Sequence, residues 1–202
     1  MALVSIRQGD DMEYPNWFEQ TAKANFEKFL TPIAGKGGLR FLQLGVYTGD
    51  ASLWLAQNIL THKTSFLTDI DTWKGSDEDA HHEMDFEDVH KTYLEKTKDY
   101  RKSISSRRCE TIWFFLHTSQ YTGYDFIYID ADHTTVGVLV DAELSWRLLS
   151  IGGIMAFDDY TWGEDMPPHL TPALGIDLFL DRHEGEYETL IINQQYWIRK
   201  TK

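Results

Sequence analysis

Cysteine, proline and basic residues are all scarce in this chain of 202 residues. The single cysteine, Cys109, cannot form a disulfide within the chain, which is typical of proteins in the reducing cytoplasm. Lys and Arg together number 19, against 32 Asp and Glu, so the formal net charge is -13. Because such a surface repels phosphate groups, we expect neither a nucleic acid nor an anionic membrane as a partner.

Long apolar runs and a leader pattern are missing as well. No run approaches the ~18 apolar residues of a membrane span, and the N-terminus lacks the basic and then apolar pattern of a signal peptide. We therefore expect a cytoplasmic protein. Hydrophobic residues nevertheless make up 42% of the chain and aromatic residues 14%, which is enough for the core of one domain. We predict a single domain over residues 1–202, with 1–38 as a helical extension packed on the core.

Short apolar runs alternate along the chain with segments of helical periodicity. This alternation predicts an α/β protein with a Rossmann-like, doubly wound sheet that helices cover on both faces. We expect a seven-stranded, mostly parallel sheet that ends in a C-terminal antiparallel hairpin. The strands located by the pattern are 39–44, 65–71, 124–130 and 153–159, with two more in 187–200; the helices are 14–30, 50–60, 83–99, 109–117, 136–149 and 172–183.

Two glycines follow the first of these strands, in "LQLGVYTGDAS". Gly45 allows a sharp turn between strand and helix, and Gly49 allows a ligand to approach the main chain. The alternative is a turn with a purely structural role. Ligands of doubly wound sheets bind at the carboxyl ends of the strands, and the glycine spacing matches neither the pyrophosphate-binding G-x-G-x-x-G pattern nor a P-loop. A cofactor with a nucleoside but no phosphate therefore fits better than a nicotinamide dinucleotide.

Two acids, Asp69 and Asp71, end the second strand. A carboxylate at this place can accept hydrogen bonds from both hydroxyls of a ribose. The pattern does not say which of the two does so, and the other is expected to cap a helix or to be solvated. Trp73 follows closely, and it either stacks on a purine or belongs to the core.

A second group of polar residues ends the next two strands. Asp130, Asp132 and His133 follow one strand, and Asp158 and Asp159 follow the other. Neighbouring strands lie about 4.8 Å apart, so these side chains can converge, and converging carboxylates repel one another unless a cation neutralises them. We therefore predict a divalent metal, with Mg²⁺ as the expected ion, and His133 as general base for an acceptor hydroxyl. The alternative is that these residues cap helices or are solvated.

Four segments resemble class I S-adenosylmethionine-dependent methyltransferases of the small-molecule type: "FLQLGVYTGDAS", "TDIDTWKGS", "YDFIYIDADH" and "GGIMAFDDYTW". More narrowly, residues 39–160 are similar to the macrocin-O-methyltransferase-like group, whose relatives include catechol and caffeoyl-CoA O-methyltransferases. The resemblance implies S-adenosylmethionine as cofactor and Mg²⁺ as in the metal-dependent relatives. It also implies methylation of a hydroxyl on a small molecule, a sugar ahead of a catechol.

The resemblance assigns roles by position. Gly45 and Gly49 border the methionine part of the cofactor, and Asp69 or Asp71 binds its ribose. Together with the residue patterns, this gives one predicted site. The cofactor-binding residues are Gln43, Gly45, Gly49, Asp69, Asp71, Trp73 and Asp130; the metal ligands are Asp130, Asp158 and Asp159; and the catalytic residues are His133 and Asp130.

Two positions depart from the family pattern. Gln43 stands where many relatives have an acid, so it can hydrogen-bond the cofactor's amino group but does not attract it by charge. Asp159 stands where the cation-dependent catechol relatives have an asparagine. Aspartate is an acceptable oxygen ligand, so this change weakens the catechol analogy more than the metal analogy.

We predict an enzyme, a metal-assisted O-methyltransferase with a small-molecule acceptor. The alternatives are a metal-dependent hydroxylase or lyase on the same scaffold, and a non-catalytic module that retains the cofactor pocket. Whether the protein is a homo-oligomer stays open. Three further features are noted: the acidic segment 75–90 with its three histidines is a solvated loop, a lid or a metal site; Trp162 and His169 are candidates for an acceptor wall; and Trp17 is a candidate for closing the site.

Overall fold

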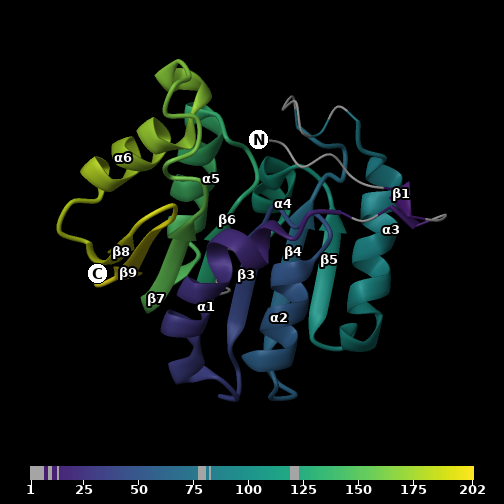
Figure 1. The fold of residues 1–202 in the computed structure, drawn as a ribbon. Coiled ribbons are helices and arrows are strands. Elements are labelled where there is room, and N and C mark those ends of the chain that lie inside the picture. Colours follow the sequence, from purple (N-terminus) through teal and green to yellow (C-terminus); the bar gives the residue numbers. More distant parts are fainter. Residues whose placement is uncertain (1–6, 9–10, 13, 77–80, 82, 119–122) are drawn as a thin grey trace.

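The computed structural model has a twisted sheet at its centre, with helices on both sides (Figure 1). The strands of the large sheet are β3 Arg40–Leu44, β4 Phe66–Asp71, β5 Ile104–Arg108, β6 Tyr124–Ile129, β7 Leu149–Phe157, β8 Tyr187–Ile192 and β9 Tyr196–Lys200. The helices are α1 Lys23–Leu30, α2 Asp50–Asn58, α3 Phe86–Thr97, α4 Thr111–His117, α5 Thr135–Trp146 and α6 Pro172–Arg182. Two short strands, β1 Arg7–Gln8 and β2 Asp11–Met12, pair with each other. The structure describes residues 7–8, 11–12, 14–76, 81, 83–118 and 123–202.

The strand order of the large sheet is β5-β4-β3-β6-β7-β9-β8. The pairs among β3 to β7 are parallel, whereas β9 pairs antiparallel with both β7 and β8. The order therefore reverses between β3 and β6, because the chain adds strands on one side of β3 and then returns to its other side. Sheets of this kind bind ligands at the carboxyl ends of the strands where the order reverses, which are β3 and β6 in this protein.

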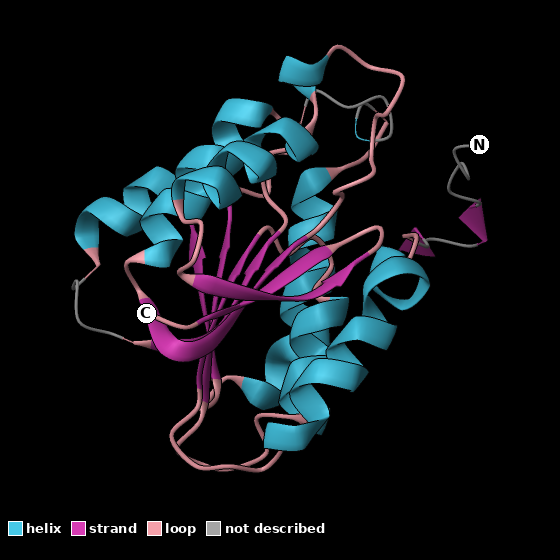
Figure 2. Cartoon of the chain, turned by 90° about the vertical axis from the view of Figure 1, so that its left-hand side faces the viewer, coloured by secondary structure: helices cyan, strands magenta, loops and turns pink. Residues whose placement is uncertain are grey.

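Alternating side chains of the strands build two hydrophobic clusters, one on each face of the sheet. Leu42 and Leu44 of β3 pack in the cluster that α5 and α6 cover, and Phe41 packs in the cluster under α1 and α2. Figure 2 views the sheet nearly edge-on and shows helices on both of its faces. The predicted doubly wound α/β fold with seven strands and a C-terminal hairpin is confirmed.

The seventh strand is β5, which the sequence pattern did not locate. Its sequence, ISSRR, is polar and only Ile104 is buried, because β5 is the edge strand of the sheet beside β4. Charged residues are common on edge strands, where they oppose pairing with other chains. An amphipathic or apolar pattern is therefore absent, and periodicity alone cannot find such a strand.

The helices differ from the predicted ranges mainly at their ends. The N-terminal helix was expected over 14–30, but helical structure begins with a π-helical turn at Phe18–Ala22 and continues as α1. Further short 3-10 turns are Thr31–Ile33, Lys98–Tyr100 and Pro168–Leu170. Among the described residues, no helix combines the length and the apolar character that crossing a membrane requires.

Candidate active site at the carboxyl ends of the strands

The glycine turn, residues 45–49, joins the end of β3 to α2. Gly45 has a φ of 79°, and a Cβ at this position would lie 1.7 Å from the main-chain oxygen of Asp130. Gly49 has a φ of 81° and caps α2, and a Cβ there would lie 2.6 Å from Cδ2 of Tyr93. Both positions therefore need glycine, for the left-handed backbone as well as for space. The turn is pressed against the end of β6 on one side and against α3 on the other.

Asp71 and Asp69 lie on the same face of β4, but at different depths. Asp71 ends the strand, and one of its carboxylate oxygens accepts hydrogen bonds from the main-chain N–H groups of Val46 (2.7 Å) and Tyr47 (3.0 Å). Its other oxygen accepts one from the N–H of Trp73 at 2.6 Å. Asp71 thus lies beside the glycine turn and remains partly exposed.

Asp69 lies two residues deeper and is fully buried. The Tyr93 hydroxyl donates to its carboxylate at 2.9 Å. Burial raises the pKa of Asp69 to about 7, although hydrogen bonds from Ser52 and Tyr93 oppose the shift. The structure therefore places the two acids that the sequence left as alternatives in different environments: Asp71 is partly exposed at the strand end, and Asp69 is fully buried.

Two more of the predicted cofactor residues are buried. Trp73 is only 2% exposed; its ring lies 4.2 Å from that of His90 and 4.9 Å from that of Tyr93, so its environment is that of a core aromatic. Its indole N–H donates to the main-chain oxygen of Tyr47 at 2.9 Å, which supports the glycine turn from below. Gln43 is buried as well, and its amide donates to the main-chain oxygen of Gly45 at 3.0 Å.

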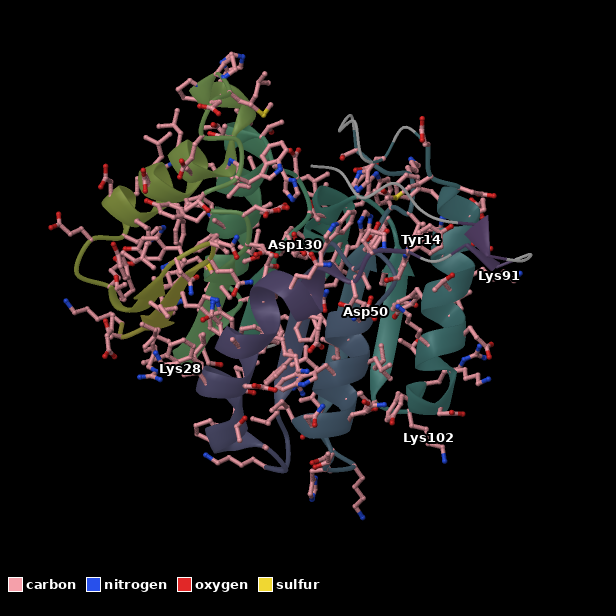
Figure 3. All side chains as sticks on the ribbon, in the orientation of Figure 1. Tyr14, Lys28, Asp50, Lys91, Lys102 and Asp130 are labelled. Carbon is pink, nitrogen blue, oxygen red and sulfur yellow. The ribbon has the colours of Figure 1, made fainter. Side chains whose placement is uncertain are left out.

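Asp130, His133 and Asp159 come together above the ends of β6 and β7, and we call these three residues the acid–histidine group. Nε2 of His133 lies 3.3 Å from Oδ2 of Asp159 and 3.6 Å from Oδ1 of Asp130. One potential ligand atom from each of the three lies within 4.8 Å of the others. Burial and the nearby carboxylates of Asp158 and Asp159 raise the pKa of Asp130, whereas His133 opposes the shift. Figure 3 shows Asp130 near the middle of the view, above the N-terminal helix and to the left of Tyr14.

Three non-glycine residues with a strained, left-handed backbone lie at the same edge of the sheet. Tyr47, Trp73 and Asp159 are the described non-glycine residues with positive φ, at 54°, 46° and 55°. They follow β3, β4 and β7, respectively. A left-handed conformation costs such residues about 1 kcal/mol or more, and it persists where the surroundings demand it, often at functional sites. The strain therefore agrees with the position of the site inferred from the strand order.

Asp158 is not among the three residues whose potential ligand atoms converge, although its charge acts on Asp130. Its predicted role as a metal ligand stays a prediction. Its side chain continues the alternation of β7 onto the face that α1 covers, where one oxygen accepts from the Tyr128 hydroxyl and the other from the Gln195 amide at 2.9 Å. Gln195 is fully buried, and its oxygen accepts from Asn25 at 2.8 Å and from the indole of Trp197 at 2.9 Å. Asp158 therefore ties the end of β7 to the C-terminal hairpin and to α1.

This network predicts a different outcome for two neighbouring glutamines. Gln195→Leu removes one hydrogen bond each from Asp158, Asn25 and Trp197, while Asp158 keeps the one from Tyr128. We therefore expect the free energy of unfolding to fall by about 2 kcal/mol. Gln194→Leu changes an exposed side chain in the same turn and should alter it by less than about 0.5 kcal/mol. Urea unfolding of both variants measures the difference, and equal stabilities would show that the network contributes nothing.

Other sequence candidates lie around the acid–histidine group. The ring of Trp162 lies 5.4 Å from that of His133, and its role in an acceptor wall stays a prediction. Asp132 accepts from the N–H of Thr134 at 2.8 Å and so supports the start of α5. Trp17 stacks on Tyr47 of the glycine turn, with ring centroids 4.6 Å apart. His169 is exposed in the loop before α6, and of the histidines in 75–90, His82 lies outside the described residues.

Sequence reasoning missed Tyr93, Tyr128 and Gln195 as parts of the site. Tyr93 was assigned to the inward face of a helix, and its role below Gly49 depends on how α3 docks. Tyr128 precedes Asp130 by two residues on β6, so the strand alternation already placed both on one face. Gln195 had no signal in the sequence, because only the folded hairpin brings it to Asp158.

Asp141 is a second buried carboxyl with a strongly raised pKa. It lies on α5 and accepts from the Thr111 hydroxyl at 2.6 Å, which joins α5 to α4. Burial raises its pKa to about 7, with a further contribution from Asp132. Since Asp69 and Asp141 both hold their protons more tightly in the folded state, their stabilisation is complete below pH 4 and is lost as the pH rises to about 7.

Substitution of either acid by asparagine should reverse that loss. The amide keeps an acceptor oxygen for Tyr93 or Thr111 and carries no charge, so Asp69→Asn and Asp141→Asn should each exceed the wild type in unfolding free energy by about 2 kcal/mol at pH 8. At pH 5 the gain should disappear. Urea unfolding at both pH values measures it, and a variant whose stability curve runs parallel to that of the wild type would contradict the assignment for that residue.

Comparisons with known proteins identify the family. A family model described as a methyltransferase domain matches residues 42–160, more than half of the chain. The chain belongs to this methyltransferase family. The matched segment runs from β3 to just beyond β7 and contains the glycine turn and the acid–histidine group, so the family resemblance stated from the sequence is confirmed. No curated protein matches the methyltransferase significantly.

Solved structures share the fold of the methyltransferase at low sequence identity. An O-methyltransferase from Bacillus cereus, in complex with SAH, is 16% identical with a TM-score of 0.62, covering 92% of this chain and 88% of that one. The O-methyltransferase TomG from Streptomyces achromogenes, involved in tomaymycin synthesis and in complex with SAM, is 13% identical with a TM-score of 0.61, covering 94% and 92%. A protein from Clostridium thermocellum described as a candidate rRNA methylase is 11% identical with a TM-score of 0.66, covering 90% and 97%. At these identities the likeness shows the shared fold alone.

Proposed function

We propose that the protein is an S-adenosylmethionine-dependent O-methyltransferase that acts on a hydroxyl of a small molecule. The observation that carries the proposal is that the glycine turn and the acid–histidine group lie side by side, since Gly45 packs against the main chain of Asp130. The turn that would bind a nucleoside cofactor and a group that would accept a proton are therefore neighbours, as the proposed reaction requires. The complexes of the Bacillus and Streptomyces proteins with SAH and SAM support this choice of cofactor.

The residues of this site divide between binding and proton transfer. Asp71 would bind the ribose, because its carboxylate lies at the strand end next to the turn, and the main chain of the turn would line the methionine part. When bound, the cofactor supplies an electrophilic methyl group. His133 would accept the proton of the acceptor hydroxyl, with Asp130 and Asp159 orienting the imidazole and stabilising its charged form.

A divalent cation is compatible with the same side chains. Two carboxylates and one imidazole within 4.8 Å of one another make a donor set that Mg²⁺ or Mn²⁺ accepts. Asp130, Asp159 and His133 would hold such an ion, whereas Asp158 is engaged by Tyr128 and Gln195. The ion would lower the pKa of an acceptor hydroxyl and position it.

A small polar acceptor fits the charge of the protein better than a nucleic acid does. The formal net charge of -13 opposes the approach of a phosphate backbone. The half-buried Trp162 beside His133 offers an aromatic surface on which a ring-shaped acceptor, such as a sugar or a catechol, could lie.

Calorimetric titration with S-adenosylmethionine, with and without Mg²⁺, tests the proposal first. We expect micromolar binding in both conditions, and methyl transfer to at least one hydroxyl compound in a panel of sugars and catechols. Loss of turnover in EDTA would establish the metal, and unchanged turnover in EDTA would exclude it. No detectable binding of the cofactor would overturn the proposed function.

A further inference from the structure

The glycine turn lies over a layer of buried polar side chains, which we call the sub-turn layer: Gln43, Ser52, Asp69 and Tyr93. Gln43 and Asp69 are register partners on β3 and β4, so their side chains lie next to each other on the face that α2 covers. The Ser52 hydroxyl of α2 donates to the oxygen of Gln43 at 3.3 Å. In a buried hydrogen-bond network of this kind, a change in the charge of one side chain alters the hydrogen bonds of its neighbours.

Two members of the layer support the turn, and Trp73 supports it at a third point. Gln43 donates to the main-chain oxygen of Gly45, and the ring of Tyr93 packs directly against Gly49. Between them, the indole of Trp73, whose ring lies 4.9 Å from Tyr93, donates to the main-chain oxygen of Tyr47. Asp69 is the only carboxyl group among these residues, and it holds Tyr93 through the hydrogen bond of 2.9 Å.

Few charged or titratable groups face Asp69. Tyr93 from α3 donates to it, and Asp71 on its own strand repels its negative charge. Beyond Trp73 lies His90, with the rings 4.2 Å apart, and Lys96 of α3 pairs with Asp50 at the start of α2 at 2.8 Å.

The side chain of Arg108 on β5 completes this set of neighbours, because its guanidinium donates to the main-chain oxygen of Trp73 at 3.3 Å. No cation among the described residues is recorded in contact with the Asp69 carboxyl, so hydrogen bonds are the main interactions that stabilise its negative charge.

From this arrangement we infer that Asp69 is a positioning residue which loses its proton when the cofactor binds, so that cofactor affinity is linked to pH. The inference rests on the proposed function, since it assumes S-adenosylmethionine in the pocket above the turn. The cofactor brings a sulfonium and an ammonium group, which favour a negative charge in the layer below. The proton passes from the Asp69 carboxyl to the buffer.

Burial holds the pKa of Asp69 near 7, so the group is about half protonated at neutral pH before binding. If binding lowers that pKa by one unit, about 0.4 proton is released at pH 7, and affinity rises about tenfold from acid to alkaline pH. The ionised carboxylate also strengthens the hydrogen bond that holds Tyr93 against Gly49. The negative charge of Asp69 and the stronger hydrogen bond to Tyr93 therefore both favour cofactor binding.

The test is titration calorimetry with S-adenosylmethionine at pH 7 in phosphate and in Tris, whose ionisation enthalpies differ. The difference between the observed enthalpies counts the protons released. We expect the wild type to release about 0.4 proton more than Asp69→Asn. Proton exchange by the cofactor's own amino group is common to both proteins and cancels in this comparison.

Asp141→Asn is the matched control, because Asp141 is also buried with a pKa of about 7 but belongs to α5. It should release as many protons as the wild type. Equal proton counts for the wild type and Asp69→Asn, with cofactor bound in both, would overturn the inference and leave the proposed function intact. If no variant binds S-adenosylmethionine at any pH, the proposed function fails and the inference fails with it.

Discussion

Gly45→Ala should abolish binding of S-adenosylmethionine. The added Cβ would lie 1.7 Å from the main-chain oxygen of Asp130 and 2.4 Å from its carbonyl carbon, at a backbone φ of 79°. Since both atoms belong to the backbone, no side-chain rotation relieves the overlap, and either the glycine turn or the end of β6 must move. We expect the free energy of unfolding to fall by about 3 kcal/mol and cofactor affinity to fall by about 100-fold or more, as measured by urea unfolding and calorimetry.

Gly38→Ala distinguishes the two effects expected of Gly45→Ala, the strain of the left-handed backbone and the overlap with Asp130. Gly38 also has a φ of 79°, but a Cβ at this position would meet no atom within 4 Å. It therefore carries only the cost of the left-handed conformation, about 1 kcal/mol, and cofactor binding should stay within twofold of the wild type. If Gly45→Ala folded and bound the cofactor as tightly as Gly38→Ala, the glycine turn would not be the cofactor site.

The fold was predictable because most of its strands are buried and apolar. β3, β6 and β7 are rich in hydrophobic residues and mostly buried, and helices of clear periodicity separate them. β5 was not predicted from the sequence pattern. As an edge strand it has one partner strand and an exposed side, so its sequence is not required to be apolar. The order of strands in the sheet likewise follows from the connections between parallel strands, and not from any single segment.

The site was predictable to the level of strand ends but not of side-chain direction. Asp158 and Asp159 are neighbours in the sequence, yet Asp158 follows the alternation of β7 toward α1, and the chain turns at Asp159 through a positive φ. Asp69 and Asp71 share one face of β4, and their spacing of two residues, roughly 6.6 Å along a strand, separates a buried acid from a partly exposed one. Depth and turn geometry are tertiary properties, which composition and spacing do not encode.

His133→Ala should lower the rate of methyl transfer by about 100-fold or more without changing the affinity for S-adenosylmethionine. His133 offers Nε2 to both Asp159 and Asp130, and its ring lies beside Trp162. The imidazole is therefore the group that we propose as the base, and its removal leaves the residues of the glycine turn unchanged. The measurement compares the rate at saturating cofactor, on a hydroxyl acceptor found in the panel, with the dissociation constant from calorimetry.

His62→Ala provides the control, because His62 is an exposed histidine in the turn between α2 and β4, at the amino end of that strand. It should retain the wild-type rate, and a near-wild-type rate for His133→Ala would exclude His133 from catalysis.

The His133→Ala variant also distinguishes the two roles that the acid–histidine group permits, general base and metal ligand. If His133 is a metal ligand, millimolar Mn²⁺ should restore part of the rate, since the two carboxylates still offer oxygen ligands. If it is the base, added metal leaves the rate low, because no other imidazole among the described residues belongs to this group and accepts the proton.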